Sequence, residues 1–429
     1  MTAPDARGPA PVTGLVAVAV LVAVALGGVA LTQMRGGSTP PADDGHTAPS
    51  AQASSEPLAR GASSEAERAS EASRALLSIE DAVLGEREAA FDRVFADTRS
   101  STSAGDDIFT SLRRLPLATY SLRYIGEVSH RGRTWRADVE VQWGLRAVDP
   151  RAATSEIEVT FRADGERTRV VAMSPADGEH APVWLMGRLQ VEKVRDALML
   201  SLQPPLTDTI VAQTRKAVRD VRAVIGDWPG GLVVVLPKDT EQLEQVLAAK
   251  QGTYDSIAAV TTSADDVTGP RAPVRIVLNP PVFTGLGPIA GQVVLTHEAT
   301  HAATDATFSD LPLWLVEGFA DYVALAGEPV PVDVAAGQVL ARVRRRGPPQ
   351  TLPGSKAFAT SSHGLGAAYE AAWLAAQLIA EERGEARLLR FYSTAQRTGD
   401  VDQAFASVLQ TDSEQFTRDW RAYLRELAR

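Results

Sequence analysis

The residues of this chain that could do chemistry are His297, Glu298 and His301, in the spacing His-Glu-x-x-His. A separation of four residues puts both imidazoles on one face of a helix, where they can bind the same metal ion. The glutamate between them points toward the open coordination position of that metal and can accept a proton from water there. Glu317 follows His301 by sixteen residues and would complete three protein ligands from a following helix. The pattern predicts a hydrolytic zinc site, and the alternative is a satisfied histidine pair in a protein core.

Two helices are needed to position these residues. Apolar side chains recur at helical spacing around the motif and predict a half-buried helix: Ile289, Val293, Val294, Ala299 and Ala302. Pro312 and Gly327 bracket a second helix that carries Glu317. Asp321 lies four residues after Glu317, on the same helical face, and could bind the far nitrogen of a ligand histidine.

The motif and the run Trp314-Leu315-Val316-Glu317-Gly318-Phe319-Ala320 together resemble the gluzincin metallopeptidases, most closely their peptidase MA-like catalytic domains. The resemblance implies that His297, His301 and Glu317 are zinc ligands, that Glu298 is the general base and that Asp321 orients a ligand histidine. The motif block covers roughly thirty residues, and a looser likeness extends from about Leu206 to the C-terminus. No Gly-x-Met-Glu-Asn segment precedes His297, although aminopeptidases with this motif use one to bind a free amine. This departure argues against an aminopeptidase and leaves two alternatives, an endopeptidase, which it favours, or an enzyme with an unusual substrate.

The reaction predicted for such a site is zinc-assisted hydrolysis of a peptide bond, with Glu298 moving the proton. A tetrahedral oxyanion needs a further donor, normally a Tyr or His from the helical C-terminal part. Tyr369 is the first candidate, and His363 and Tyr322 are alternates. An ordinary core tyrosine is an equally good interpretation of Tyr369.

Composition narrows the function further. The formal net charge of −10 argues against nucleic-acid binding as a main role. The 429 residues contain no cysteine, so a zinc ion must be held by nitrogen and oxygen atoms. The expected partners are therefore a peptide or protein substrate and, from the N-terminal segment, a membrane.

The N-terminal segment predicts a membrane anchor. Residues 12–31 are uncharged and long enough to cross a bilayer as a helix. We assign residues 1–11 to a tail, 12–34 to a transmembrane anchor and 35–72 to a Ser/Ala/Pro-rich tether. This arrangement predicts a single-pass protein of the cell membrane with an extracytoplasmic catalytic domain. The alternative is a signal peptide that is cleaved.

Residues 73–203 predict an α+β domain, because a helical pattern is followed by alternating strands with turns at Gly132 and Gly165. The element order resembles the NTF2-like domains. Large aromatic residues in this part could line a ligand pocket, although they are more often core: Trp135, Trp143 and Trp184.

Residues 204–429 predict a mixed α/β, zincin-like domain that ends in a helical subdomain. The run 274–281 ends in two prolines, which suits an edge strand before the motif helix. In gluzincins such a strand pairs with an extended substrate. Two other functions stay open. One is a membrane-tethered ligand-binding or scaffolding protein with a structural or degenerate zinc site, and the other is a ligand-binding NTF2-like domain with a regulatory peptidase remnant.

Overall fold

The structure is a computed structural model, and it describes residues 64–96, 98–165, 167–203, 207–226, 228, 231–265, 269, 271–359 and 362–429. The predicted tail, the predicted anchor and residues 35–63 of the predicted tether lie outside these residues. No helix within the described ranges is both long and apolar enough to cross a membrane.

Helix α1 (Glu65–Leu84) starts within the segment predicted as tether, so the prediction that the tether extends to residue 72 is wrong. Ser64 caps the helix, and Glu67 completes a capping box by binding the Ser64 backbone N–H. The polar residues 65–72 therefore form the start of an amphipathic helix and are not part of a linker.

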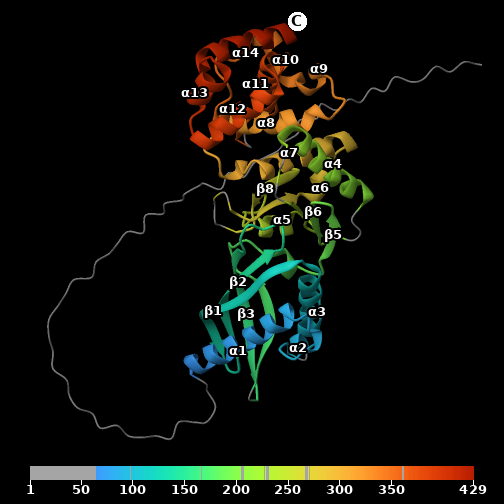
Figure 1. Cartoon of the computed structure of the whole chain (residues 1–429). Helices are drawn as coiled ribbons and strands as arrows, with labels where there is room; N and C mark the ends of the chain where they lie inside the picture. The colour runs from blue at the N-terminus through green and yellow to red at the C-terminus, as the bar shows by residue number, and fades with distance from the viewer. Residues whose placement is uncertain are drawn as a thin grey trace, which may run out of the picture.

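The N-terminal unit contains three helices followed by an antiparallel sheet (Figure 1). The helices are α1, α2 (Glu88–Asp92) and α3 (Arg99–Arg114). The strands pair in the order β1-β2-β3-β4, with bounds Leu117–Arg131, Thr134–Leu145, Ala153–Asp164 and Arg167–Pro175. Gly132 and Gly165, with φ of 62° and 66°, occupy the predicted hairpin turns. The predicted order of helices before an antiparallel sheet is confirmed, and the NTF2-like resemblance remains a prediction.

The tryptophans of this unit are core residues. Trp135 stacks on Phe161 with ring centroids 5.5 Å apart, and the Trp184 ring meets Tyr120 edge-on. Trp143 lies against the Arg275 guanidinium, 5.3 Å from it. These side chains bury large apolar surfaces inside the unit and so stabilise it.

A second sheet has the strand order β5-β6-β7-β9-β8. Its strands are β5 (Gln190–Val194), β6 (Ala197–Ser201), β7 (Leu232–Leu236), β8 (Ala259–Ser263) and β9 (Val274–Leu278). β6, β7 and β9 are parallel, whereas β5 and β8 are antiparallel edges. The first two strands belong to this sheet, so the predicted boundary between residues 203 and 204 is too late. Local sequence does not show this, because β6 pairs with β7 across the intervening helix α4 (Asp208–Ile225).

The prediction of an edge strand at 274–281 is wrong, because β9 lies inside the sheet between β7 and β8. The two prolines come after the strand and form the first turn of α6 (Pro280–Phe283), where a missing N–H removes no sheet hydrogen bond. The edge next to the motif helix is β8.

Alternate residues of the second sheet contribute to two cores. Val234 and Ile276 pack in the core of the C-terminal helices, while Val233 and Val277 pack with the N-terminal unit. The sheet therefore forms the middle layer of the molecule, between the N-terminal unit and the helical C-terminal part (Figure 1). Burial of both faces explains the uninterrupted apolar run of β7.

The C-terminal part is helical. Besides α4 and α6, its helices are α7 (Pro288–Ala303), α8 (Leu313–Ala326), α9 (Val332–Ala335), α10 (Gly337–Arg346), α11 (Leu365–Arg383), α12 (Glu385–Thr398), α13 (Val401–Ala404) and α14 (Ser413–Leu427). Helix α5 (Thr240–Val246) packs instead with the N-terminal unit. Short turns η1 (Val183–Leu185), η2 (Ala306–Phe308), η3 (Ser355–Phe358) and η4 (Phe405–Leu409) complete the elements. The fold is thus α+β, with a mixed sheet and a helical C-terminal end as predicted.

Candidate metal centre

Helix α7 carries the His-Glu-x-x-His motif on a fully buried turn. Pro288 occupies its first turn, where the absent N–H is not needed for the helix. The imidazole Nε2 atoms of His297 and His301 face each other at 2.8 Å. Both side chains are at most 1% exposed. The sequence spacing thus places two metal-binding nitrogens together.

Helix α8 brings the third ligand atom. Glu317 Oε2 lies 3.2 Å from His297 Nε2 and 3.5 Å from His301 Nε2. A tetrahedral zinc ion bound at roughly 2.0–2.2 Å requires ligand atoms about 3.3 Å apart. Glu317 Oε2 is buried, and within the described part of the chain it accepts no hydrogen bond of regular geometry. The donor set and the two distances from Glu317 therefore fit a zinc ion held by nitrogen and oxygen. The two Nε2 atoms, at 2.8 Å, would have to part by about 0.5 Å to bind it.

Asp321 orients the first histidine. Its Oδ1 accepts a hydrogen bond of 2.7 Å from Nδ1 of His297. With the proton on Nδ1, the lone pair of Nε2 is directed toward His301 and Glu317 and is available to a metal. The structure therefore puts Asp321 where the spacing predicted it.

The centre requires a positive charge. Burial alone would lower the pKa of His297, but Asp321 and Glu317 outweigh it and raise that pKa to about 10. Burial alone would raise the pKa of Glu317, but the two imidazoles lower it below its usual value. Without a metal ion, a proton on His297 is the cation that balances these carboxylates.

Glu298, the residue that follows His297 on α7, contacts strand β8. Its Oε2 accepts a hydrogen bond from the hydroxyl of Thr261, which also donates to the Glu298 backbone carbonyl at 3.1 Å. Glu298 Oε1 is buried and has no hydrogen-bond partner among the described residues. Burial raises the pKa of Glu298, so this carboxylate is a stronger base than an exposed one. Sequence reasoning missed Thr261, because nothing local connects residue 261 to residue 298.

The candidates for the oxyanion donor differ in their placement. Tyr369 on α11 is buried, with its ring centroid 6.3 Å from that of His297. Burial and the nearby carboxylates raise the pKa of Tyr369 well above its usual value, so its hydroxyl stays protonated. Tyr322 instead donates its hydroxyl to Glu385 at 2.9 Å, and His363 is exposed in the turn before α11. The geometry favours Tyr369 over both alternates, and its catalytic role remains a prediction.

Gly318 explains how α8 reaches the centre. An added Cβ at this position would lie 2.3 Å from the backbone oxygen of Ala372 on α11. The absence of a side chain lets the two helix backbones touch, and this contact sets the depth of Glu317, the preceding residue.

Strand β8 is also held by the N-terminal unit. Arg151 binds both oxygens of Asp265, at 2.6 and 2.9 Å, just beyond the end of β8. Burial alone would raise the pKa of Asp265, but hydrogen bonds from Arg151, Ser263 and the Thr154 backbone lower it. Arg275 of β9 forms a second ion pair with Asp149, and both side chains are at most 3% exposed. These contacts join the two units beside the strand that carries Thr261, and sequence reasoning missed them.

Comparisons with known proteins give distant structural likenesses. No family model matches the chain, and no curated protein matches it. One similar solved structure is a two-domain M1 zinc metallopeptidase, a glutamate-to-alanine mutant bound to L-arginine, with 15% identity and a TM-score of 0.35. The match covers 71% of this chain and 61% of that chain, so this chain spans less than two thirds of its length. Another is an M1 zinc metallopeptidase mutant from Deinococcus radiodurans bound to a Tyr-Ser-Ala substrate, with 13% identity and a TM-score of 0.34. That match covers 67% of this chain and 89% of that chain.

Proposed function

We propose that this chain is a zinc-dependent peptidase with Glu298 as its general base. The observation that carries the proposal is the convergence of one ligand atom each from His297, His301 and Glu317 within 4.8 Å of one another. The base lies one residue from the first of these ligands. A zinc ion bound there would act as a Lewis acid on the scissile carbonyl and would make water a better nucleophile at neutral pH.

The protein residues have separate tasks in this proposal. His297, His301 and Glu317 would hold the ion, and Asp321 would keep His297 in the tautomer that binds. Glu298 would accept the proton of the attacking water and deliver it to the leaving amine. The protonated Tyr369 hydroxyl would donate a hydrogen bond to the carbonyl oxygen as its negative charge grows.

A retained base supports catalysis over a structural metal role. A purely structural zinc site is closed by four protein ligands, whereas three ligand atoms converge here among the described residues. The buried carboxylate of Glu298 is near enough to both imidazoles for their charge to act on its pKa. The lack of a Gly-x-Met-Glu-Asn segment supports an endopeptidase. Strand β8, as the edge next to α7, would take the substrate-pairing role that the sequence suggested for β9.

The site of action is also a proposal. The uncharged run at residues 12–31 supports a single-pass membrane anchor with the catalytic part outside the cell membrane. Protease added to intact cells should then digest the catalytic part. Digestion only after lysis would place that part in the cytoplasm.

The test of function is Glu298→Gln, which keeps size and removes the base. We expect a loss of peptide hydrolysis of roughly a hundredfold or more, with one equivalent of zinc still bound. Chelation of the wild-type protein should abolish hydrolysis and added zinc should restore it. Unchanged cleavage of a peptide library by Glu298→Gln would refute the role of Glu298, and lack of zinc binding by the wild type would refute the metal centre.

A further inference from the structure

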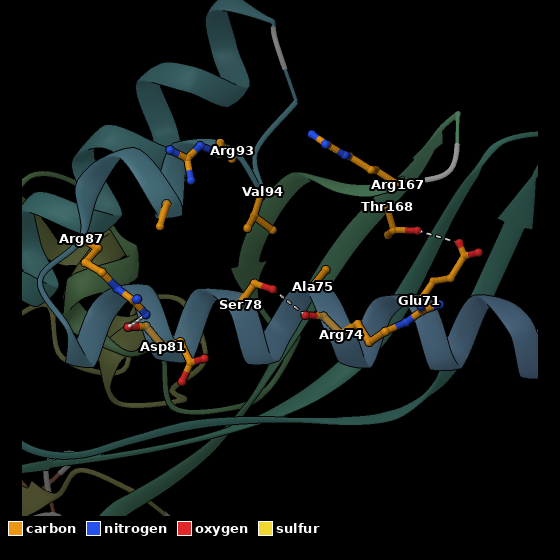
Figure 2. Close-up of a pocket in the computed structure, with 11 residues that line it drawn as sticks. Glu71, Arg74, Ala75, Ser78, Asp81, Arg87, Arg93, Val94, Arg167 and Thr168 are labelled. Atoms are coloured by element: carbon orange, nitrogen blue, oxygen red, sulfur yellow. Dashed lines mark hydrogen bonds between the residues drawn. The ribbon is translucent and has the colours of Figure 1, made fainter.

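A hollow in the N-terminal unit, far along the chain from the metal centre, is rich in arginine. It has a volume of about 440 Å³ and lies between α1, the region of α2 and strand β4 (Figure 2). Its charged lining consists of Arg74, Arg87, Arg93, Arg167, Glu71 and Asp81. The net formal charge of this lining is +2, whereas the whole chain carries −10. We call this hollow the arginine groove.

The guanidinium groups of the groove keep N–H donors for a ligand, although Arg74 and Arg87 each donate to a backbone oxygen of α1. None of them forms an ion pair with any carboxylate in the part of the chain that the structure describes. Arg87 donates to the backbone oxygen of Asp81 at 2.9 Å. The carboxylate of Glu71 is engaged by the hydroxyl of Thr168 at 2.8 Å. Figure 2 shows α1 as the floor, with Arg93 and Arg167 on opposite sides above it.

The two walls of the groove are tied together by backbone hydrogen bonds. Val170 of β4 donates to Val94 at 2.8 Å and accepts from Ala96 at 2.9 Å. Arg169 adds a bond of 2.9 Å to the backbone oxygen of Arg93. The backbones that carry Arg93 and Arg167 are therefore held in a defined relative position before any ligand binds, which lowers the entropic cost of binding.

We propose that the arginine groove binds a ligand that carries a phosphate group. Several guanidinium forks around one hollow match the three or four acceptor oxygens of phosphate better than the two of a carboxylate. The volume is that of a site for a small molecule and exceeds what one phosphate ion would fill. Ala75 and Val94 line the groove as well and offer apolar surface to the rest of the ligand.

A phosphate group of this kind comes from a soluble phosphorylated compound or from a lipid headgroup. Two probes without acyl chains distinguish these sources: glycerol 3-phosphate, a monoester, and glycerophosphoglycerol, a diester. Binding of each to the full chain in neutral detergent is measured by isothermal titration calorimetry. We expect saturable binding of at least one probe that weakens with added salt, because the contacts are ionic.

The decisive variant is Arg93→Gln with Arg167→Gln, which removes the two arginines on opposite sides of the groove. We expect binding to weaken by roughly ten- to a hundredfold, because two charge-assisted sets of hydrogen bonds are lost. The matched control is Arg113→Gln with Arg131→Gln, two exposed arginines of the same unit outside the groove. This control has the same change in net charge and should alter binding less than twofold. Thermal unfolding of both double variants should match the wild type.

Each result decides the proposal. Tighter binding of the monoester supports a soluble phosphorylated ligand, and tighter binding of the diester supports a lipid headgroup. Absence of binding by both probes would overturn the proposal, as would an equal loss in the two double variants. Binding of a poly-glutamate peptide without binding of either probe would also overturn it and would assign the groove to an acidic protein partner.

Discussion

Substitution of Gly318 by alanine should damage both the fold and the metal centre, because α8 and α11 touch at this residue. The added Cβ would lie 2.3 Å from Ala372 O and 2.6 Å from Ala372 C. Carbon–oxygen contacts between backbones are normally no closer than about 3.3 Å, so α8 has to move by roughly 1 Å. Overpacking of this kind costs about 1–3 kcal/mol of unfolding free energy.

The same shift would displace Glu317, the neighbouring residue. Metal–ligand distances tolerate changes of only about 0.2 Å, so a displacement of roughly 1 Å should weaken zinc binding as well as stability. A loss of about 1–3 kcal/mol lowers the thermal midpoint of a unit of this size by roughly 2–12 °C. Differential scanning calorimetry and zinc titration against a fluorescent chelator measure the two effects.

Gly337→Ala is the matched control. Gly337 is also helical, at the start of α10, and an added Cβ would meet no atom within 4 Å. This variant should unfold at or slightly above the wild-type temperature and should bind zinc normally. Equal unfolding temperatures and equal zinc affinities for Gly318→Ala and the wild type would refute the role given to the helix contact.

Further predictions concern the residues around the centre. Thr261→Val should lower kcat about tenfold while zinc stoichiometry stays the same, because Glu298 loses the hydroxyl that orients it. The control is Thr262→Val on the same strand, and equal kcat values for the two variants would argue against this role of Thr261. Asp321→Ala should weaken zinc affinity by roughly ten- to a hundredfold, as measured by competition with a chelator, and an unchanged affinity would contradict the hydrogen bond to His297. In the metal-free protein the pKa of His297 is raised to about 10, above its unfolded value. Its stabilisation should therefore be complete below about pH 6.5 and lost as the pH rises toward 10, and urea unfolding of the metal-free protein that shows no such decline would refute it.

The sequence by itself predicted the features that depend on short-range spacing. The order of helices before an antiparallel sheet follows from apolar periodicity, and the turns at Gly132 and Gly165 follow from the need for a positive φ. The spacing of His297 and His301 on one helix dictates that their imidazoles meet, as they do at 2.8 Å. Their role as zinc ligands remains a prediction of the same pattern.

Tertiary structure alone decided the features that depend on residues far apart in the chain. Strand β8 became the edge beside α7, and β5 and β6 joined the second sheet, because strand pairing is set by contacts across long separations. The hydrogen bond from Thr261 to Glu298 spans 37 residues, and the ion pair of Arg151 with Asp265 spans 114. A short stretch of sequence determines which donor atoms it holds and whether they recur with the period of a helix or a strand. The distant residue that each side chain contacts is selected by the packing of the whole chain.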